Sequence, residues 1–197
     1  MPTFQLNLSY RNVDVEDLDQ LEAIAKTVPH AYVICVDGQT RILAALEATS
    51  AIEAVELLVE AIHSADAHAE PVAVELSLMS ISEIASLVGL NREAVRLWTV
   101  GKRGPGNFPA PVDTVGDRIK VWAAHDVWLW LKDNSIPCPN ARPLSMAEVA
   151  DGTRTIERLR RHWLNLPTLT GAANWRVAKH EEMTVPVHHA RRKAASF

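Results

Sequence analysis

Two short capped segments with a glycine between them stand near the middle of the chain. Ser80 and Glu83 have the spacing of a capping box, which predicts a helix that begins at the next residue. Asn91 is a good N-cap for a second helix. Gly89 lies between the two, where the chain has to turn sharply. The pattern predicts two short helices joined by a tight turn.

Each of these two predicted helices has an apolar side. In the first helix, the apolar stripe consists of Ile81, Ile84, Ala85 and Val88. In the second, Ala94, Val95 and Trp98 project toward the first helix, and Arg92, Glu93, Arg96 and Thr99 project away from it or flank that outer face. A short helix with an anchored back and arginines in front suits the major groove of DNA, where arginine donates two hydrogen bonds to guanine. The alternative is that both arginines lie on a solvated helix face.

A loop and a hairpin follow the second helix. Residues 101–111 are too rich in glycine and proline for a helix or an inner strand, and they include Lys102 and Arg103. Residues 112–115 and 118–121 flank the two-residue turn Gly116-Asp117, which predicts a hairpin with Arg118 and Lys120 on one side. We expect these four cations to hold DNA phosphates. The apolar helix expected at 124–131 needs cover on several sides, from the N-terminal domain or a second subunit.

Residues 80–131 resemble the MerR-type winged-helix domain in its excisionase and AlpA-like small form. The loop from Lys102 to Asn107 departs from that family, because it lengthens the connection to the wing. The resemblance implies sequence-specific binding of duplex DNA, commonly as a dimer, in transcription control or in recombination. It rests on an ordered set of motifs: Glu83-Ile84-Ala85, Gly89, Arg92 to Trp98, Phe108-Pro109-Ala110-Pro111, Trp122, Asp126-Val127 and Trp130-Leu131.

The first 78 residues predict the order strand, helix, strand, strand, helix, strand. Strands are expected at 4–10, at the apolar run 31–36 (buried, and containing Cys35), at 41–48 after the hairpin signal Asp37-Gly38, and at 72–78. The capping box Ser50 to Glu53 opens the second helix. The apolar stripes of the two helices are Leu18, Leu21, Ala25 and Val28, and then Ile52, Val55, Val59 and Ile62.

This βαββαβ order is that of the ferredoxin-like fold, with both helices on one face of an antiparallel sheet. RNA binding through the sheet is disfavoured, because the middle strands lack exposed aromatic residues and the segment is acidic. The fold alone does not choose between dimerisation and the sensing of a small effector. Both are kept as hypotheses for residues 1–78.

The charges are distributed unevenly along the chain. Residues 1–78 contain three basic residues against thirteen acidic ones, whereas residues 79–197 contain seventeen against eleven. A polyanion is therefore expected to approach the second part and to be repelled by the first.

The C-terminal residues predict a linker, a basic helix and a tail. Prolines mark residues 135–143 as a linker, Ser145 and Glu148 cap a helix, and Gly152 is expected to interrupt it. The helix expected at 153–165 has Ile156, Leu159 and Trp163 on one side. Its cations Arg154, Arg158 and Arg161 are a candidate second phosphate contact. A degenerate second helix-turn-helix is an alternative reading. We expect the tail at 188–193 to add nonspecific attraction to DNA.

Other chemistry finds little support in the sequence. The chain shows no P-loop, no Cys-x-x-Cys and no His-Glu-x-x-His, so we expect neither an enzyme nor a cofactor. His180, His188 and His189 have no spacing typical of a metal site. Two distant cysteines, Cys35 and Cys138, fit reduced thiols in the cytoplasm, and no signal peptide or membrane-spanning run is apparent.

The sequence thus predicts an α+β protein in three parts. These are a βαββαβ ferredoxin-like dimerisation or sensing domain (1–78), a winged helix-turn-helix (79–132), and a linker with a helical segment and tail (133–197). The predicted function is a dimeric regulator of transcription that binds double-stranded DNA. Alternatives are a protein-interaction or inhibitor module acting through the acidic domain, and an architectural factor in recombination. The predicted DNA-binding residues are Asn91, Arg92, Glu93, Arg96, Thr99, Lys102, Arg103, Arg118, Lys120, Arg154, Arg158 and Arg161.

Overall fold

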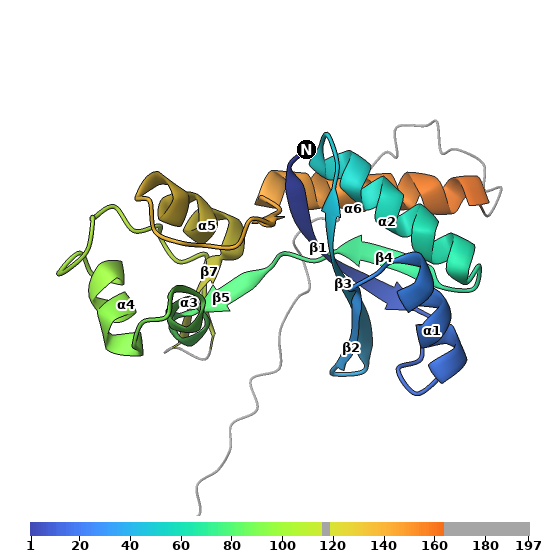
Figure 1. The fold of residues 1–197 in the computed structure, drawn as a ribbon, viewed down its shortest axis with the longest axis horizontal. Helices are drawn as coiled ribbons and strands as arrows, with labels where there is room; N and C mark the ends of the chain where they lie inside the picture. The colour runs from blue at the N-terminus through green and yellow to red at the C-terminus, as the bar shows by residue number, and fades with distance from the viewer. Residues whose placement is uncertain (116–118, 164–197) are drawn as a thin grey trace, which may run out of the picture. The chain divides into compact units, whose positions relative to one another are not determined.

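The computed structural model describes residues 1–115 and 119–163, all within one compact unit, Met1–Leu166. In these residues the chain is mixed α and β (Figure 1). The expected Gly116-Asp117 turn, Arg118, the end of the expected basic helix after residue 163, and the tail with its histidines lie outside the described residues.

The first sheet has the strand order β2-β3-β1-β4, with each neighbouring pair antiparallel. Its strands are β1 (Thr3–Arg11), β2 (Tyr32–Val36), β3 (Gln39–Glu47) and β4 (Glu70–Val74). The short β8 (Arg142–Pro143) pairs with β1 in parallel. Asp37 and Gly38 form the predicted turn between β2 and β3, with positive φ values of 52° and 76°. The expected order of the first four strands and two helices is confirmed.

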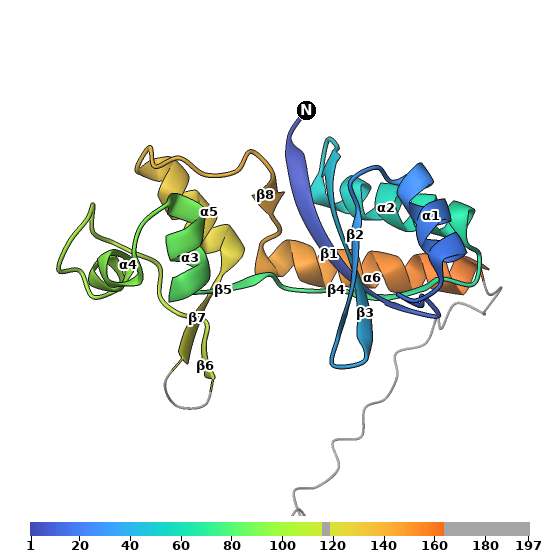
Figure 2. The same ribbon diagram turned by 60° about the horizontal axis from the view of Figure 1, so that its bottom comes forward.

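Three helices share a core with this sheet: α1 (Leu18–Thr27), α2 (Ala51–Ala65) and α6 (Met146–Trp163) (Figures 1 and 2). The predicted inner residues Val55, Val59 and Ile62 of α2 are buried. The predicted stripe of α1 is wrong in part, because Leu18 (77% exposed) and Ala25 are exposed, whereas Ile24 is buried. Asp17 caps the helix, so Leu18 is its first residue. The side of the helix that meets the core carries Ile24.

β2 also differs from expectation. Its apolar run was expected to be buried, but β2 is the edge strand of the sheet and only one of its side chains, Val33, is half-buried. Tyr32, Ile34 and Val36 are 70%, 39% and 41% exposed. A continuous apolar run is typical of an inner strand, and only the strand order determines that this one lies at the edge. Cys35 is exposed.

The single strand expected at residues 72–78 is two strands in two sheets. β4 ends at Val74, and the backbone N–H of Glu75 makes a last hydrogen bond to the carbonyl oxygen of Asn7, at 2.7 Å. β5 (Leu78–Ser80) then pairs with β7 (Ile119–Ala123), which pairs with β6 (Asp113–Val115). The alternation of apolar residues runs through the change of sheet, so the sequence does not reveal it.

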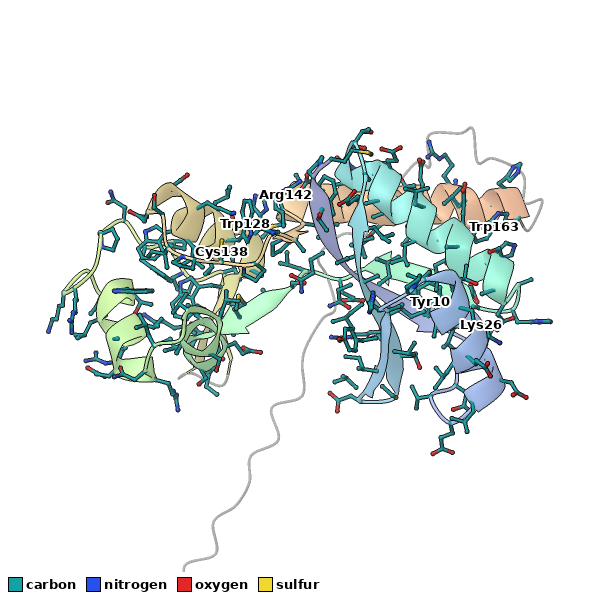
Figure 3. All side chains as sticks on the ribbon, viewed as in Figure 1. Tyr10, Lys26, Trp128, Cys138, Arg142 and Trp163 are labelled. Atoms are coloured by element: carbon teal, nitrogen blue, oxygen red, sulfur yellow. The ribbon has the colours of Figure 1, made fainter. Side chains whose placement is uncertain are left out.

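The second core lies among α3 (Ile81–Val88), α4 (Arg92–Thr99), α5 (Ala124–Asp133) and the second sheet. The apolar α5 is covered by neighbouring loops: Phe108 from the loop after α4, and Ile136 and Cys138 from the expected linker. Figure 3 labels Trp128 of α5, whose Nε1 donates to the carbonyl oxygen of Pro139 at 2.9 Å. Leu129 of α5 remains 41% exposed.

α6 is continuous through Gly152, contrary to the expected interruption. The Cα of Gly152 lies against Val74 of β4 and Val55 of α2, and a Cβ at this position would approach Val74 Cγ2 to 2.8 Å. The predicted apolar stripe Ile156, Leu159 and Trp163 packs into the first core. Gly152 therefore permits close packing, and the turn that a second helix-turn-helix would need is absent from residues 146–163.

Candidate nucleic-acid interface

The helix pair α3–α4 has the caps that the sequence predicts. Ser80 and Glu83 form a complete capping box, in which the Ser80 backbone N–H donates to the Glu83 carboxylate at 2.7 Å. Gly89 adopts the left-handed conformation, with φ of 66°, after the last turn of α3. Asn91 Oδ1 accepts from the backbone N–H of Ala94 at 2.8 Å and opens α4. These local bonds fix where both helices begin and how sharply the chain turns between them.

Aromatic side chains hold the back of α4. Val95 and Trp98 are buried, and the Trp98 ring lies 5.2 Å from that of Trp130 on α5. Phe108 packs edge-on against Trp130, with 4.8 Å between ring centroids. Aromatic pairs of this geometry add to the free energy gained by burial alone. The predicted inner face of α4 is confirmed at Val95 and Trp98.

The long loop after α4 is built into this cluster. The backbone N–H groups of Lys102 and Arg103 both donate to the carbonyl oxygen of Leu97, at 2.9 and 3.3 Å. Trp130 Nε1 donates to the carbonyl oxygen of Gly106 at 2.9 Å. The exposed side chains of Lys102 and Arg103 therefore continue directly from the end of α4. The sequence shows the length and charge of this loop but not what fixes it.

The front of α4 is polar and exposed. Arg92, Glu93 and Arg96 are all exposed, as expected. Thr99 is half-buried, and its hydroxyl donates to the carbonyl oxygen of Arg96 at 2.9 Å, so its proton is already used within the helix. Asn91 uses Oδ1 as a cap. Of these residues, Arg92 and Arg96 have the donors best suited to a base edge.

Arg96 and Glu93 form a bidentate ion pair on this front face. The Arg96 Nε and one Nη donate to the two oxygens of Glu93 at 2.7 and 2.6 Å. The hydrogen bonds from Arg96 hold the pKa of Glu93 below its usual value, and the same bonds raise the pKa of Arg96. Glu93 is thus ionised near neutral pH and occupies the donors that Arg96 would offer to guanine. The sequence predicts both residues on this face but does not reveal that they pair.

The hairpin presents one described cation, Lys120. It lies on β7 opposite Thr114 of β6 and is exposed. Arg118, which was expected beside it, lies outside the described residues. Trp122 on the same strand is buried, and its Nε1 donates to the carbonyl oxygen of Pro109 at 3.0 Å, so the base of the hairpin is tied to the second core.

The three arginines expected to extend the interface lie on α6, whose apolar side belongs to the first core. Arg154 pairs with Asp151 of its own helix, and Arg158 pairs with Glu56 of α2. Arg161 is exposed. Arg160, which is not among the predicted DNA contacts, pairs with Glu70. The guanidinium groups of Arg154 and Arg158 thus already have carboxylate partners within the chain.

No group of three or more His, Cys, Asp or Glu side chains in residues 1–115 and 119–163 is arranged to hold a metal ion. None of the helices in those residues has the length and apolar character needed to cross a membrane.

Comparison with known proteins gives no relative: no family model, no curated protein and no solved structure matches this chain.

Proposed function

We propose that this protein binds double-stranded DNA in a sequence-specific manner and regulates transcription, with residues 80–131 as a winged helix of the MerR and excisionase type. The observation that carries the proposal is the two-sidedness of α4. Its back is anchored by Val95 and Trp98, while its front exposes Arg92 and Arg96. A capped, anchored and short helix with exposed arginines has the features of a recognition helix.

The strand order β2-β3-β1-β4 supports a ferredoxin-like assignment for the first core, with α1 and α2 as its two crossover helices. α6 is an addition to that fold. The exposed apolar edge at Tyr32, Ile34 and Val36 supports dimerisation through β2, because natural edge strands usually carry charges or prolines that prevent pairing.

In the proposed complex, Arg92 and Arg96 read bases, and Lys102, Arg103 and Lys120 hold phosphates. Arg96 has to leave Glu93 before it reaches guanine, and Glu93 then accepts from a cytosine amine or faces solvent. Asn91 and Thr99 make secondary contacts from the two ends of α4. We assign Arg154, Arg158 and Arg161 a lesser role, since two of the three already pair with carboxylates.

The test combines selection of bound sequences from random duplexes with two variants. Arg96→Ala is expected to relax the selected sequence and to weaken binding by about 1–3 kcal/mol. Lys120→Ala is the matched control, because a lost phosphate contact weakens all sequences alike and reduces the salt dependence by about one ion. The proposal fails if the protein causes no salt-sensitive shift of any duplex at low ionic strength.

A second candidate is a protein-interaction or inhibitor module, and the exposed edge of β2 favours it. Ile34→Lys places a charge in the middle of that edge and distinguishes the two functions. If DNA binding is primary, this variant keeps its affinity for a single half-site and loses only the gain from pairing. If partner binding is primary, the variant loses its partner while duplex binding is negligible in both proteins.

A further inference from the structure

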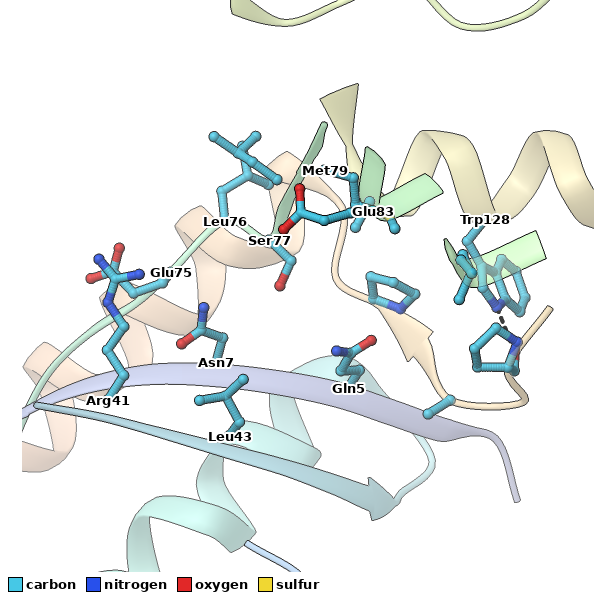
Figure 4. A pocket seen from close by; sticks show the side chains of 16 residues that line it. Gln5, Asn7, Arg41, Leu43, Glu75, Leu76, Ser77, Met79, Glu83 and Trp128 are labelled. Carbon is cyan, nitrogen blue, oxygen red and sulfur yellow. Dashed lines mark hydrogen bonds between the residues drawn. The ribbon is translucent and has the colours of Figure 1, made fainter. Parts of the chain in front are cut away.

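The face of the first sheet opposite its helices bears a cavity of about 630 Å³ (Figure 4). Its floor is formed by alternate residues of β1 and β3, among them Asn7, Arg41 and Leu43. Glu75 and Leu76, which follow β4, contribute to its wall, and the side that faces the sheet is lined from α3, α5 and residues 139–143. This volume lies in the range of sites for small molecules, roughly 300–1,000 Å³.

Two polar atoms, in side chains that line this cavity, have no partner. Asn7 Oδ1 and Arg41 Nε are buried, and neither makes a hydrogen bond to any residue that the structure describes. Leaving such atoms unpaired costs free energy, and most buried polar groups in folded proteins are paired. Asn7 and Arg41 thus bring an amide and a guanidinium to the cavity whose hydrogen-bonding capacity the described residues do not fill, and a ligand with a donor and an anionic acceptor complements such a pair.

The charges lining the cavity narrow the class of ligand. Arg41 is the cation, and among the described residues it forms no ion pair. Glu75 and Glu83 are the carboxylates, and Glu83 is already used by the capping box of α3. Arg41 and Glu75 are therefore left to face a ligand. A purely anionic ligand would be repelled by Glu75, and a purely cationic one by Arg41.

We propose that this cavity binds a small zwitterion, an α-amino acid or an amino-carboxylate of similar size. Its carboxylate lies on the Arg41 guanidinium, its ammonium group donates to Glu75, and the Asn7 side chain lies beside them. Its apolar part packs on Leu43 and Leu76. The proposal assigns a chemical class to the small effector considered above, at a site that residues 1–78 share with α3 and α5, and it does not depend on DNA binding.

The experiment measures binding of each of the twenty standard amino acids to the full chain by calorimetry and thermal shift. The best binder is then compared with two analogues, its decarboxylated amine and its deaminated acid. Each analogue is expected to bind about tenfold more weakly or worse, because each lacks one of the two charges. In amide-resolved NMR, binding is expected to shift Asn7 and Arg41 more than residues of α1.

Variants locate the site. Arg41→Met and Asn7→Leu are expected to weaken binding about tenfold or more. Arg11→Met on the same sheet is the control, because Arg11 is exposed and lies outside the cavity, and its affinity should stay within about twofold. Should Arg41→Met not fold, Arg41→Lys serves instead. The proposal is overturned if no amino acid binds at millimolar concentration, if the analogues bind as well as the amino acid, or if the folded cavity variants keep full affinity.

Discussion

Gly101 and Gly104 both have positive φ values, 67° and 86°, but only Gly104 touches a buried ring. A Cβ at Gly104 would lie 2.7 Å from Nε1 of Trp98 and closer still to its Cδ1. At Gly101 nothing lies within 4 Å of that position. Alanine substitutions at the two glycines therefore distinguish the free-energy cost of the backbone conformation from the free-energy cost of packing.

We predict that Gly104→Ala lowers the free energy of unfolding of the second core by about 3 kcal/mol, the sum of a φ penalty and overpacking. Gly101→Ala is expected to cost only about 1 kcal/mol. Urea titration followed by tryptophan fluorescence measures both. Equal costs would show that the loop is not packed against Trp98.

Glu93 is the residue that most directly opposes the proposed DNA contact. Glu93→Gln removes a negative charge from the front of α4 and frees the donors of Arg96. We predict tighter binding to nonspecific duplexes, by about three- to tenfold at low salt, because the phosphates no longer face a carboxylate. Glu22→Gln, an exposed change on α1, is the control. Unchanged or weaker binding by Glu93→Gln would argue against α4 as the contact surface.

Among the elements, α6 shows how a glycine determines packing. Helix propensity alone predicts that Gly152→Ala stabilises α6 by about 1 kcal/mol. We predict the opposite sign, a loss of about 1–2 kcal/mol, because the new Cβ would press on Val74 and Val55. Chemical denaturation checks this, and Ala150→Gly, at an exposed position of the same helix, gives the propensity cost by itself. A stabilised Gly152→Ala protein would mean that α6 can move away from the sheet.

Over the whole molecule, opposite charges from distant parts of the sequence pair with one another. The acidic first part and the basic second part meet at Arg158 with Glu56 and at Arg160 with Glu70. The opposite charges of the two parts therefore also form ion pairs within the chain, besides favouring different binding partners. Of the cations predicted to contact DNA, Arg158 pairs with a carboxylate of α2 instead.

A stronger pair, Arg142 and Glu148, joins β8 to the start of α6. Hydrogen bonds from Arg142, supported by those from Ser145, lower the pKa of Glu148 to about 2 from its usual 4.5. A lowered pKa in the folded state stabilises the fold fully above the unfolded value, and this contribution is lost as the pH falls from 4.5 toward 2.

We predict that Glu148→Gln lowers the free energy of unfolding by about 2 kcal/mol at pH 7, and that its difference from the wild type vanishes near pH 2. Urea titrations at several pH values measure this difference. Glu157→Gln, at an exposed site on the same helix, should show no such pH dependence. A constant difference between Glu148→Gln and wild type across this range would refute the role of the ion pair.

Much of the local structure could be predicted from the sequence. The capping boxes, the left-handed Gly89, the Asp37-Gly38 turn and the inner face of α4 depend on interactions within a few residues. Such interactions are encoded by residue type and spacing. For the same reason, the prediction that Arg92 and Arg96 lie on the exposed side of their helix is confirmed.

Only the tertiary structure decided what depends on distant neighbours. An apolar run does not reveal whether its strand is central or at the edge, and for this reason the prediction that β2 is buried is wrong. The alternation of apolar residues does not reveal a change of sheet either, so the sequence predicts one strand where the structure has β4 and β5. Residue type alone predicts that Gly152 interrupts the helix. In the fold, Val74 and Val55 pack where a side chain at this position would lie. The sequence by itself determined helix caps, turns and the apolar faces of helices, because these depend on residues close together in the chain. The tertiary structure decided the strand order, the partners of Arg158 and Arg160, and the cavity around Asn7 and Arg41, because each of these requires residues far apart in the chain to meet.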